Sequence, residues 1–282
     1  MHLLRPTFRA ALAAVVLALV AGCGGGSSSQ LSFAAGLDTA EFIVLDLSSG
    51  RAVTRFGLSD LATNPAYKTT QMVFRRIPGG TVTLGQAAGS PGQQADEAPT
   101  PTSVGSFYIG VFEVTQQQWQ VLAGTTPWTT VTPSSLVAGA SALPSSPAFN
   151  LSGDQVTAAI ARYRSRTASG LVLPSPAQWE HACRAGATTI YAWGDQATQA
   201  TTHAAVRETG IASPGLRTVG TLTANAFQLY DLHGNVWELT STGEIRGGSW
   251  YDGVVQARAA NKVAVESFVR HALVGCRLVL IP

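Results

Sequence analysis

Helix starts are few in this chain, and their scarcity limits the folds that it can adopt. Three predicted helix starts share one pattern, a hydroxyl residue followed three positions later by glutamine, which satisfies two backbone N–H groups left free in the first turn of a helix. The pairs are Thr115 with Gln118, Ser152 with Gln155, and Ser175 with Gln178. We predict that a helix begins after each of them.

Two of these helices show which face they bury. Beyond Ser152 the apolar residues recur at the spacing of one helical face: Val156, Ala159, Ile160 and Tyr163. Beyond Ser175 a proline suits the first helical position, and Trp179, Ala182 and Cys183 point one way. We interpret both stripes as core packing.

The rest of the chain favours short strands and loops. It holds 29 glycines, and a polar segment at 86–101 separates the β-prone runs 72–85 and 105–112. With 45% hydrophobic and 12% charged residues, the composition is that of a folded chain. We predict one α+β domain over 72–282, with short strands, few helices and long loops.

An N-terminal extension at 31–67 is predicted to precede this domain. Its β-prone runs 41–47 and 51–54 flank the turn Ser48-Ser49-Gly50, which is typical of a β-hairpin. An isolated hairpin is marginal in water. We therefore expect it to lean on the main domain or to add strands to its sheet.

The first 30 residues are predicted to target and tether the protein. Arg5 and Arg9 precede an apolar run from Ala10 to Ala21, and the segment 20–23 resembles a bacterial lipobox that ends at Cys23. An ordinary secretory signal peptide or a short transmembrane helix is the alternative, but the run is short for a bilayer. We predict a signal peptide at 1–22, an acylated Cys23 in the lipid bilayer and a Gly/Ser tether at 23–30.

The location that follows is the bacterial cell envelope. Gly24 after the cysteine is consistent with the outer membrane, facing the periplasm or the cell surface. Removal of residues 1–22 would leave 16 basic and 16 acidic side chains, since it takes away two of the 18 basic ones. This balance argues against a nucleic-acid partner, which requires a basic surface.

Cysteine usage is sparse in the predicted mature chain. Cys183 and Cys276 are the two cysteines beyond Cys23, and outside the cytoplasm they could form a disulfide. They could also be small buried hydrophobic residues. We favour the buried, unpaired state, because neither lies in a Cys-x-x-Cys or Cys/His spacing.

A series of motifs in one order covers about residues 72–282. It comprises Glu113-Val114-Thr115, the segments 147–152, 173–186, 193–195 and 230–239, Arg246-Gly247-Gly248-Ser249-Trp250, and Gly275-Cys276-Arg277-Leu278. The series resembles the formylglycine-generating enzyme family, also called the sulfatase-modifying factor (FGE-sulfatase) family. This resemblance implies a C-type-lectin-like α+β fold. For active members it implies copper held by two cysteine thiolates, with oxygen used to oxidise a substrate cysteine to formylglycine.

The resemblance places the first of those two cysteines at Asp252 and the second near Ala257. A carboxylate is a hard, poor ligand for Cu(I), and alanine is no ligand at all, so we do not expect copper-dependent oxidation. Trp237 and Ser249 match positions that line the family's substrate groove. Trp237, Ser249 and Asp252 are therefore the candidate site, although a buried tryptophan and a turn serine would also explain the first two.

The resemblance also implies a structural calcium site. Asp231, Gly234, Val236 and Glu238 match its ligands, two through carboxylates and two through backbone carbonyls. Oxygen ligands on a turn suit a hard divalent cation. In the alternative, Asp231 is a turn former and Glu238 pairs with a buried arginine, either Arg246 or Arg277.

Two classes of function follow from these observations. In the favoured one, a cell-envelope lipoprotein uses the domain to bind an unknown protein or small-molecule ligand without catalysis. In the alternative, an oxidoreductase or maturation enzyme acts on a protein or peptide with different metal chemistry, using Asp252 as a ligand or base.

Overall fold

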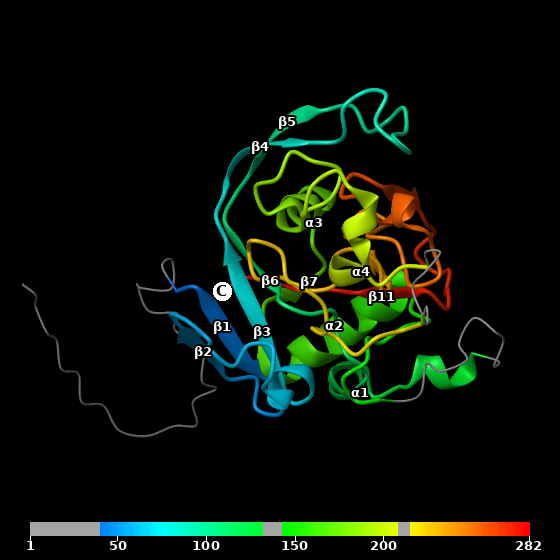
Figure 1. Cartoon of the computed structure of the whole chain (residues 1–282). Coiled ribbons are helices and arrows are strands. Elements are labelled where there is room, and N and C mark those ends of the chain that lie inside the picture. The colour runs from blue at the N-terminus through cyan, green and yellow to red at the C-terminus, as the bar shows by residue number, and fades with distance from the viewer. Residues whose placement is uncertain (1–39, 132–142, 208–214) are drawn as a thin grey trace, which may run out of the picture. The chain divides into compact units, whose positions relative to one another are not determined.

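The two β-prone runs around Ser48-Ser49-Gly50 form neighbouring strands of a six-stranded sheet in the computed structural model, which describes residues 40–131, 143–207 and 215–282 (Figure 1). The second strand is an edge of the sheet, and the first also pairs with a strand of the main body. The sheet is antiparallel throughout, in the order β2 (Ala52–Arg55), β1 (Phe42–Asp46), β3 (Gln71–Ile77), β6 (Phe107–Gly110), β12 (Val279–Leu280) and β7 (Leu171–Val172).

Both faces of this sheet are covered, which explains the continuous apolar run in β1. Because side chains alternate along a strand, Ile43 and Leu45 point into one core cluster, and Phe42 and Val44 point into another. The first cluster includes the buried faces of α1 and α2, and the second includes the buried face of α3. Figure 1 shows these helices on opposite sides of the sheet.

Each predicted helix begins at its expected cap. Thr115, Ser152 and Ser175 are the N-caps of α1 (Gln116–Ala123), α2 (Gly153–Thr167) and α3 (Pro176–Arg184), and both hydrogen bonds of the capping box are present at each. The stripes predicted on α2 and α3 are buried, which confirms their role in the core. The sequence did not indicate the short helices α4 (Ala200–His203), η2 (Pro65–Lys68), η3 (Pro127–Thr130), η4 (Ala197–Gln199) and η5 (Val254–Ala257).

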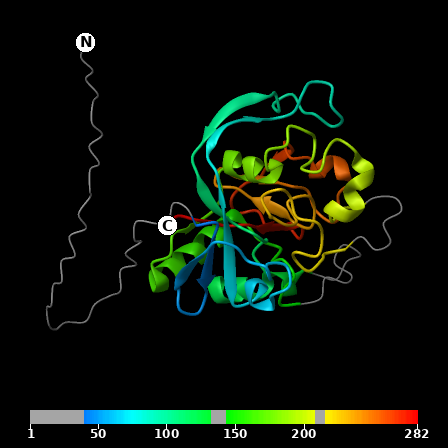
Figure 2. The same ribbon diagram turned by 60° about the vertical axis from the view of Figure 1, so that its left-hand side comes forward.

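Two smaller sheets complete the described fold. One contains β10 (Lys262–Ala264), β9 (Glu244–Arg246), β8 (Trp237–Leu239) and β11 (Val274–Cys276), with β8 and β11 parallel. The other is a hairpin of β4 (Gly80–Leu84) and β5 (Thr100–Val104), which lies against α3 and arches over it in Figures 1 and 2. The beginning of β5 lies in the segment 86–101, whose sequence predicts a polar loop.

Predictions for the N-terminal segment fall outside the described residues. Residues 1–39 include the signal peptide, the acylated Cys23 and the tether, and nothing in the structure bears on them. In the parts of the chain that the structure describes, no helix combines the length and the apolar character needed to cross a bilayer.

A buried ion pair joins the two larger sheets. The guanidinium of Arg277 lies 2.7 Å from the carboxylate of Glu238, and both side chains are almost completely excluded from solvent. Arg277 also donates to the carbonyls of Gly110, Val111 and Tyr230, so one side chain connects the end of β6 with β8. Since an unpaired buried charge is costly, the two residues depend on each other.

We expect Arg277→Met to destabilise the protein by about 3–5 kcal/mol, because it leaves the Glu238 carboxylate buried without its partner. Urea denaturation followed by circular dichroism measures this change. Arg164→Met, at an exposed position of α2, is the matched control and should change stability by less than about 0.5 kcal/mol. Equal stability of the two variants would contradict the role assigned to Arg277.

Candidate functional site

The structure brings the three candidate residues Trp237, Ser249 and Asp252 into direct contact. The Oδ2 atom of Asp252 accepts hydrogen bonds from the Ser249 hydroxyl at 2.5 Å, the Trp237 indole N–H at 2.8 Å and the Ser249 backbone N–H at 3.1 Å. We call these three residues the Asp252 cluster. Because all three donors point at the same oxygen, none of them occupies the other carboxylate oxygen, Oδ1.

The turn before Ser249 explains how the cluster is assembled. Gly247 and Gly248 both have positive φ, 90° and 73°, and a Cβ atom on Gly247 would lie 3.1 Å from a ring carbon of Trp179. This turn follows β9 and carries Ser249 back toward Trp237 at the start of β8. Ser249 and Trp237 are buried and Asp252 is half-buried, so the carboxylate is the part of the cluster nearest to solvent.

Arg207 and Tyr251 lie beside the cluster, and neither was predicted as a site residue. The Arg207 backbone N–H donates to the Asp252 carbonyl at 2.8 Å, and its guanidinium lies 4.4 Å from the centre of the Tyr251 ring. Tyr251 was adjacent to the motif and could have been included. Arg207 carried no signal, because 45 residues separate it from Asp252.

The second predicted copper position offers no side-chain ligand in the structure. Ala257 is fully buried in η5, and its carbonyl accepts a hydrogen bond from Nδ1 of His233 at 2.7 Å. Burial lowers the pKa of His233 to about 4, so the ring is neutral at physiological pH.

The two described cysteines lie in the core and do not pair with each other. Cys183 and Cys276 are both free and buried, and they belong to different core clusters. Burial raises the pKa of both thiols, which disfavours the thiolate needed to bind a soft metal. The unpaired state favoured from the sequence is therefore present.

The four predicted calcium ligands are only partly available. Both carboxylate oxygens of Glu238 accept hydrogen bonds from Arg277, and one also accepts the Trp179 indole N–H at 2.6 Å. Glu238 thus makes the buried arginine pair that was its alternative role. Within the described ranges, no group of three or more His, Cys, Asp or Glu side chains is arranged to hold a metal ion.

Asp231 is the predicted ligand that keeps an unused oxygen. Its Oδ2 accepts the Gly220 backbone N–H at 2.6 Å, whereas its buried Oδ1 has no hydrogen-bond partner among the described residues. Burial raises the pKa of Asp231 to about 6. Gly234 and Val236 are buried on the same turn. Of the two predicted carboxylate ligands, Asp231 is the one that remains available, because Glu238 is paired with Arg277.

A cavity of about 110 Å³ lies next to His233. Trp193 stacks on Tyr191 with ring centres 4.5 Å apart and on His203 at 5.2 Å. Trp193, His203 and His233 all contribute to the cavity lining. Trp193 belonged to a motif of the series, but no spacing in the sequence predicted that the two histidines would join it.

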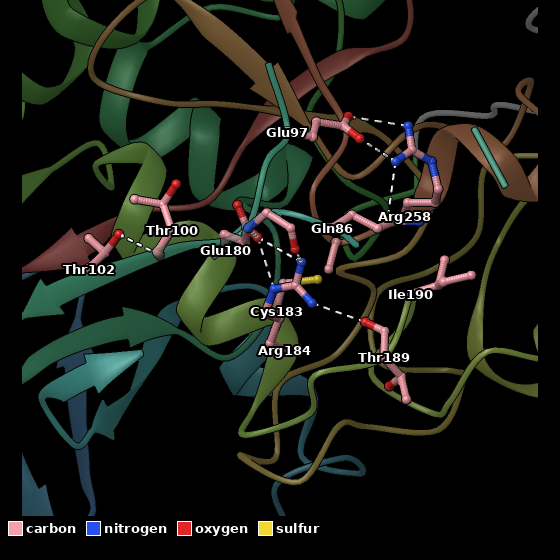
Figure 3. Close-up of polar contacts among 12 residues, drawn as sticks. Gln86, Glu97, Thr100, Thr102, Glu180, Cys183, Arg184, Thr189, Ile190 and Arg258 are labelled. Atoms are coloured by element: carbon pink, nitrogen blue, oxygen red, sulfur yellow. Dashed lines mark hydrogen bonds and ion pairs between the residues drawn. The ribbon is translucent and has the colours of Figure 1, made fainter. Parts of the chain in front are cut away.

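A network of buried charges holds the β4–β5 hairpin near the Asp252 cluster. Arg258, which directly follows η5, lies 2.6 Å from Glu97 and also donates to Gln86, as Figure 3 shows. On α3, Glu180 pairs with Arg184 at 2.8 Å and accepts the Gly85 backbone N–H. These contacts fix the hairpin to both α3 and η5, and nothing in the sequence predicted them.

Comparisons with known proteins place this geometry in a family. Residues 58–281 match the family model of the sulfatase-modifying factor enzyme 1-like domain. The formylglycine-generating enzyme of Mycobacterium tuberculosis (strain ATCC 25618 / H37Rv) is 41% identical over 83 residues, which are 26% of this chain and 28% of that enzyme. The chain therefore matches much less than two thirds of that curated relative.

Solved structures share the fold at low sequence identity. PvdO from Pseudomonas aeruginosa has a TM-score of 0.65 and 20% identity, covering 74% of this chain and 94% of that one. Treponema denticola variable protein 1 has a TM-score of 0.62 and 18% identity, covering 76% and 96%, and CarF has a TM-score of 0.56 and 18% identity, covering 73% and 97%. These likenesses confirm the predicted α+β fold.

The family match covers most of the chain, and the order of the motifs agrees with it. This protein therefore belongs to the sulfatase-modifying factor (FGE-sulfatase) domain family.

Proposed function

We propose that this protein is a lipid-anchored protein of the bacterial cell envelope whose FGE-sulfatase domain binds a ligand or partner without catalysis. The observation that carries the proposal is the Asp252 cluster. A carboxylate held by three donors occupies the position where the family resemblance implies a thiolate, and the second position is Ala257.

The hydrogen bonds of the cluster favour recognition over copper chemistry. All three donors converge on Oδ2 of Asp252, which fixes the carboxylate plane before any ligand arrives. These donors leave Oδ1 as the oxygen that accepts a hydrogen bond from the ligand. Because a carboxylate only accepts hydrogen bonds, the matching ligand group is a donor such as an amine, an amide or a hydroxyl.

The surroundings of Asp252 extend the proposed contact surface. Tyr251 and Arg207 lie next to it as a cation–π pair, and both keep part of their side chains exposed. Tyrosine and arginine are enriched at the centres of binding interfaces, since they combine apolar area with hydrogen-bonding groups. We therefore place the ligand over Asp252, Tyr251 and Arg207.

Copper binding tests the non-catalytic proposal directly. We expect the purified full-length protein to take no Cu(I) from a competing chelator, because the carboxylate of Asp252 and the methyl of Ala257 are not soft ligands. The double variant Asp252→Cys/Ala257→Cys should gain about one Cu(I) per chain, since two thiolates suit this ion. Thermal unfolding of both proteins checks that they are folded.

Metal analysis of the same wild-type preparation distinguishes the alternative function. Stoichiometric copper or iron would contradict the binding proposal and favour an oxidoreductase or maturation enzyme that uses Asp252 in different metal chemistry.

Ligand contact can be tested by photo-crosslinking in cells. A photoreactive phenylalanine derivative at Tyr251 should form a discrete crosslinked product. Asp252→Asn in the same chain should reduce the yield of this product by about tenfold, because it removes one charge-assisted hydrogen bond to the ligand. The same photoreactive residue at exposed Arg164 is the control for collisions. A product that is equally abundant with and without the Asp252→Asn substitution, or equally abundant at both labelled positions, would count against this contact surface.

We also propose a weak calcium site with fewer carboxylate ligands than the family resemblance implies. With Glu238 committed to Arg277, Asp231 would be the sole carboxylate ligand of the predicted set beside backbone carbonyls, and such a site should be weak, with a Kd of about 0.1–1 mM. We expect millimolar Ca²⁺ to raise the Tm of the wild type but not that of Asp231→Ala. Mg²⁺ is the control ion, and an unchanged wild-type Tm in Ca²⁺ would contradict the site.

A further inference from the structure

The β1–β2 hairpin forms a second cavity, separate from the Asp252 cluster. Its volume is about 530 Å³, within the range of small-molecule sites. The hairpin ends at Arg55, whereas the family match begins at residue 58. The cavity therefore depends on strands that precede the residues matched to the family model.

Strand geometry explains the lining of this cavity. Arg51, Val53 and Arg55 alternate along the chain with residues that face the other way, so their side chains lie on one face of the sheet. Across the strand pair, Val44 lies opposite Val53, and together they form an apolar floor. Tyr67, from η2, forms a wall.

The charges in this cavity are unbalanced toward the positive side. Arg51 and Arg55 are exposed, and in the described residues neither guanidinium forms an ion pair with a carboxylate. Asp46 is the one acidic residue of the lining, and its Oδ1 is occupied by Ser48 and Ser49, which donate to it at 2.7 Å. Two guanidinium groups thus line the cavity against one carboxylate, and the carboxylate of Asp60 lies behind the lining, where it accepts hydrogen bonds from Asn64 and Tyr67.

The other polar groups of the lining both donate and accept hydrogen bonds. Apart from Val44 and Val53, every lining residue has a polar side chain, including Asn64, Tyr67 and Gln71. Guanidinium groups bind carboxylate and phosphate oxygens in a bidentate manner. Amide and hydroxyl side chains match ligand hydroxyl groups, which also both donate and accept.

We propose that this cavity, which we call the hairpin site, binds a small polyhydroxylated anion, such as a sugar acid or a sugar phosphate. Arg51 and Arg55 hold the anionic group, and the amides and hydroxyls of the wall hold the ligand hydroxyls. An acidic peptide also carries anionic groups, so a short glutamate peptide is included in the test below.

Isothermal titration of the full-length protein tests the hairpin site with three probes: galacturonic acid dimer, glucose 6-phosphate and the neutral disaccharide maltose. We expect saturable binding of at least one acidic probe and none of maltose. Binding of the first probe identifies a carboxylate ligand, and binding of the second identifies a phosphate ligand.

Substitutions locate the binding. Arg51→Gln and Arg55→Gln are both at exposed positions. Each should lower the affinity for the acidic probe about tenfold or more, since each removes a charge-assisted contact. Arg164→Gln on α2 is the matched control for net charge and should leave binding unchanged. Asp252→Asn should also have no effect, which separates the hairpin site from the proposed function.

Three results would overturn the hairpin site. The first is the absence of saturable binding by both acidic probes. The second is binding that survives both arginine substitutions. The third is equal or tighter binding of a short glutamate peptide through the same arginines, which would replace the proposed ligand class by an acidic peptide.

Discussion

Buried carboxylate–guanidinium pairs hold the segments of this fold together. Glu238 pairs with Arg277, Glu180 with Arg246, and Glu97 with Arg258, and all six side chains are buried. Each pair joins parts of the chain that are far apart in sequence. Because removal of one partner leaves an uncompensated charge in the core, the two segments that each pair joins depend on each other.

This network explains why the family can be identified from the sequence motifs. Glu180, Arg246, Glu238 and Arg277 all lie in the motifs that carry the resemblance, and the structure uses them to join α3, β9, β8 and the segment after β11. These motif residues therefore stabilise the fold. Asp252 is outside these pairs, so its exchange for a thiolate would change the chemistry of the cluster without breaking the network.

Local signals in the sequence predicted local structure well. The capping boxes marked three helix starts, the apolar stripes marked buried faces, and the Ser-Ser-Gly turn marked the β1–β2 hairpin, because each depends on residues a few positions apart. Contacts over long separations were not predictable in the same way. Arg258 and Glu97 are 161 residues apart, and nothing in either local pattern identifies the partner.

In the candidate site, too, the sequence predicted which residues belong together but not the contacts between them. The sequence associated Trp237, Ser249 and Asp252 through the resemblance, but it could not show that one oxygen of Asp252 accepts all three hydrogen bonds. For Glu238 it left Arg246 and Arg277 as equal alternatives, since both are arginines in motifs. In the structure Glu238 pairs with Arg277, whereas Arg246 pairs with Glu180 and Glu244.

The Asp252 cluster and the hairpin site present opposite charges to their proposed ligands. The first offers a carboxylate that is oriented by the scaffold, and the second offers two guanidinium groups on strands outside the family match. Those strands join the main body through one strand pair, because β1 pairs with β3 and β2 forms the edge of the sheet. The hairpin thus offers its surface from outside the family match, while the buried ion pairs hold the main body.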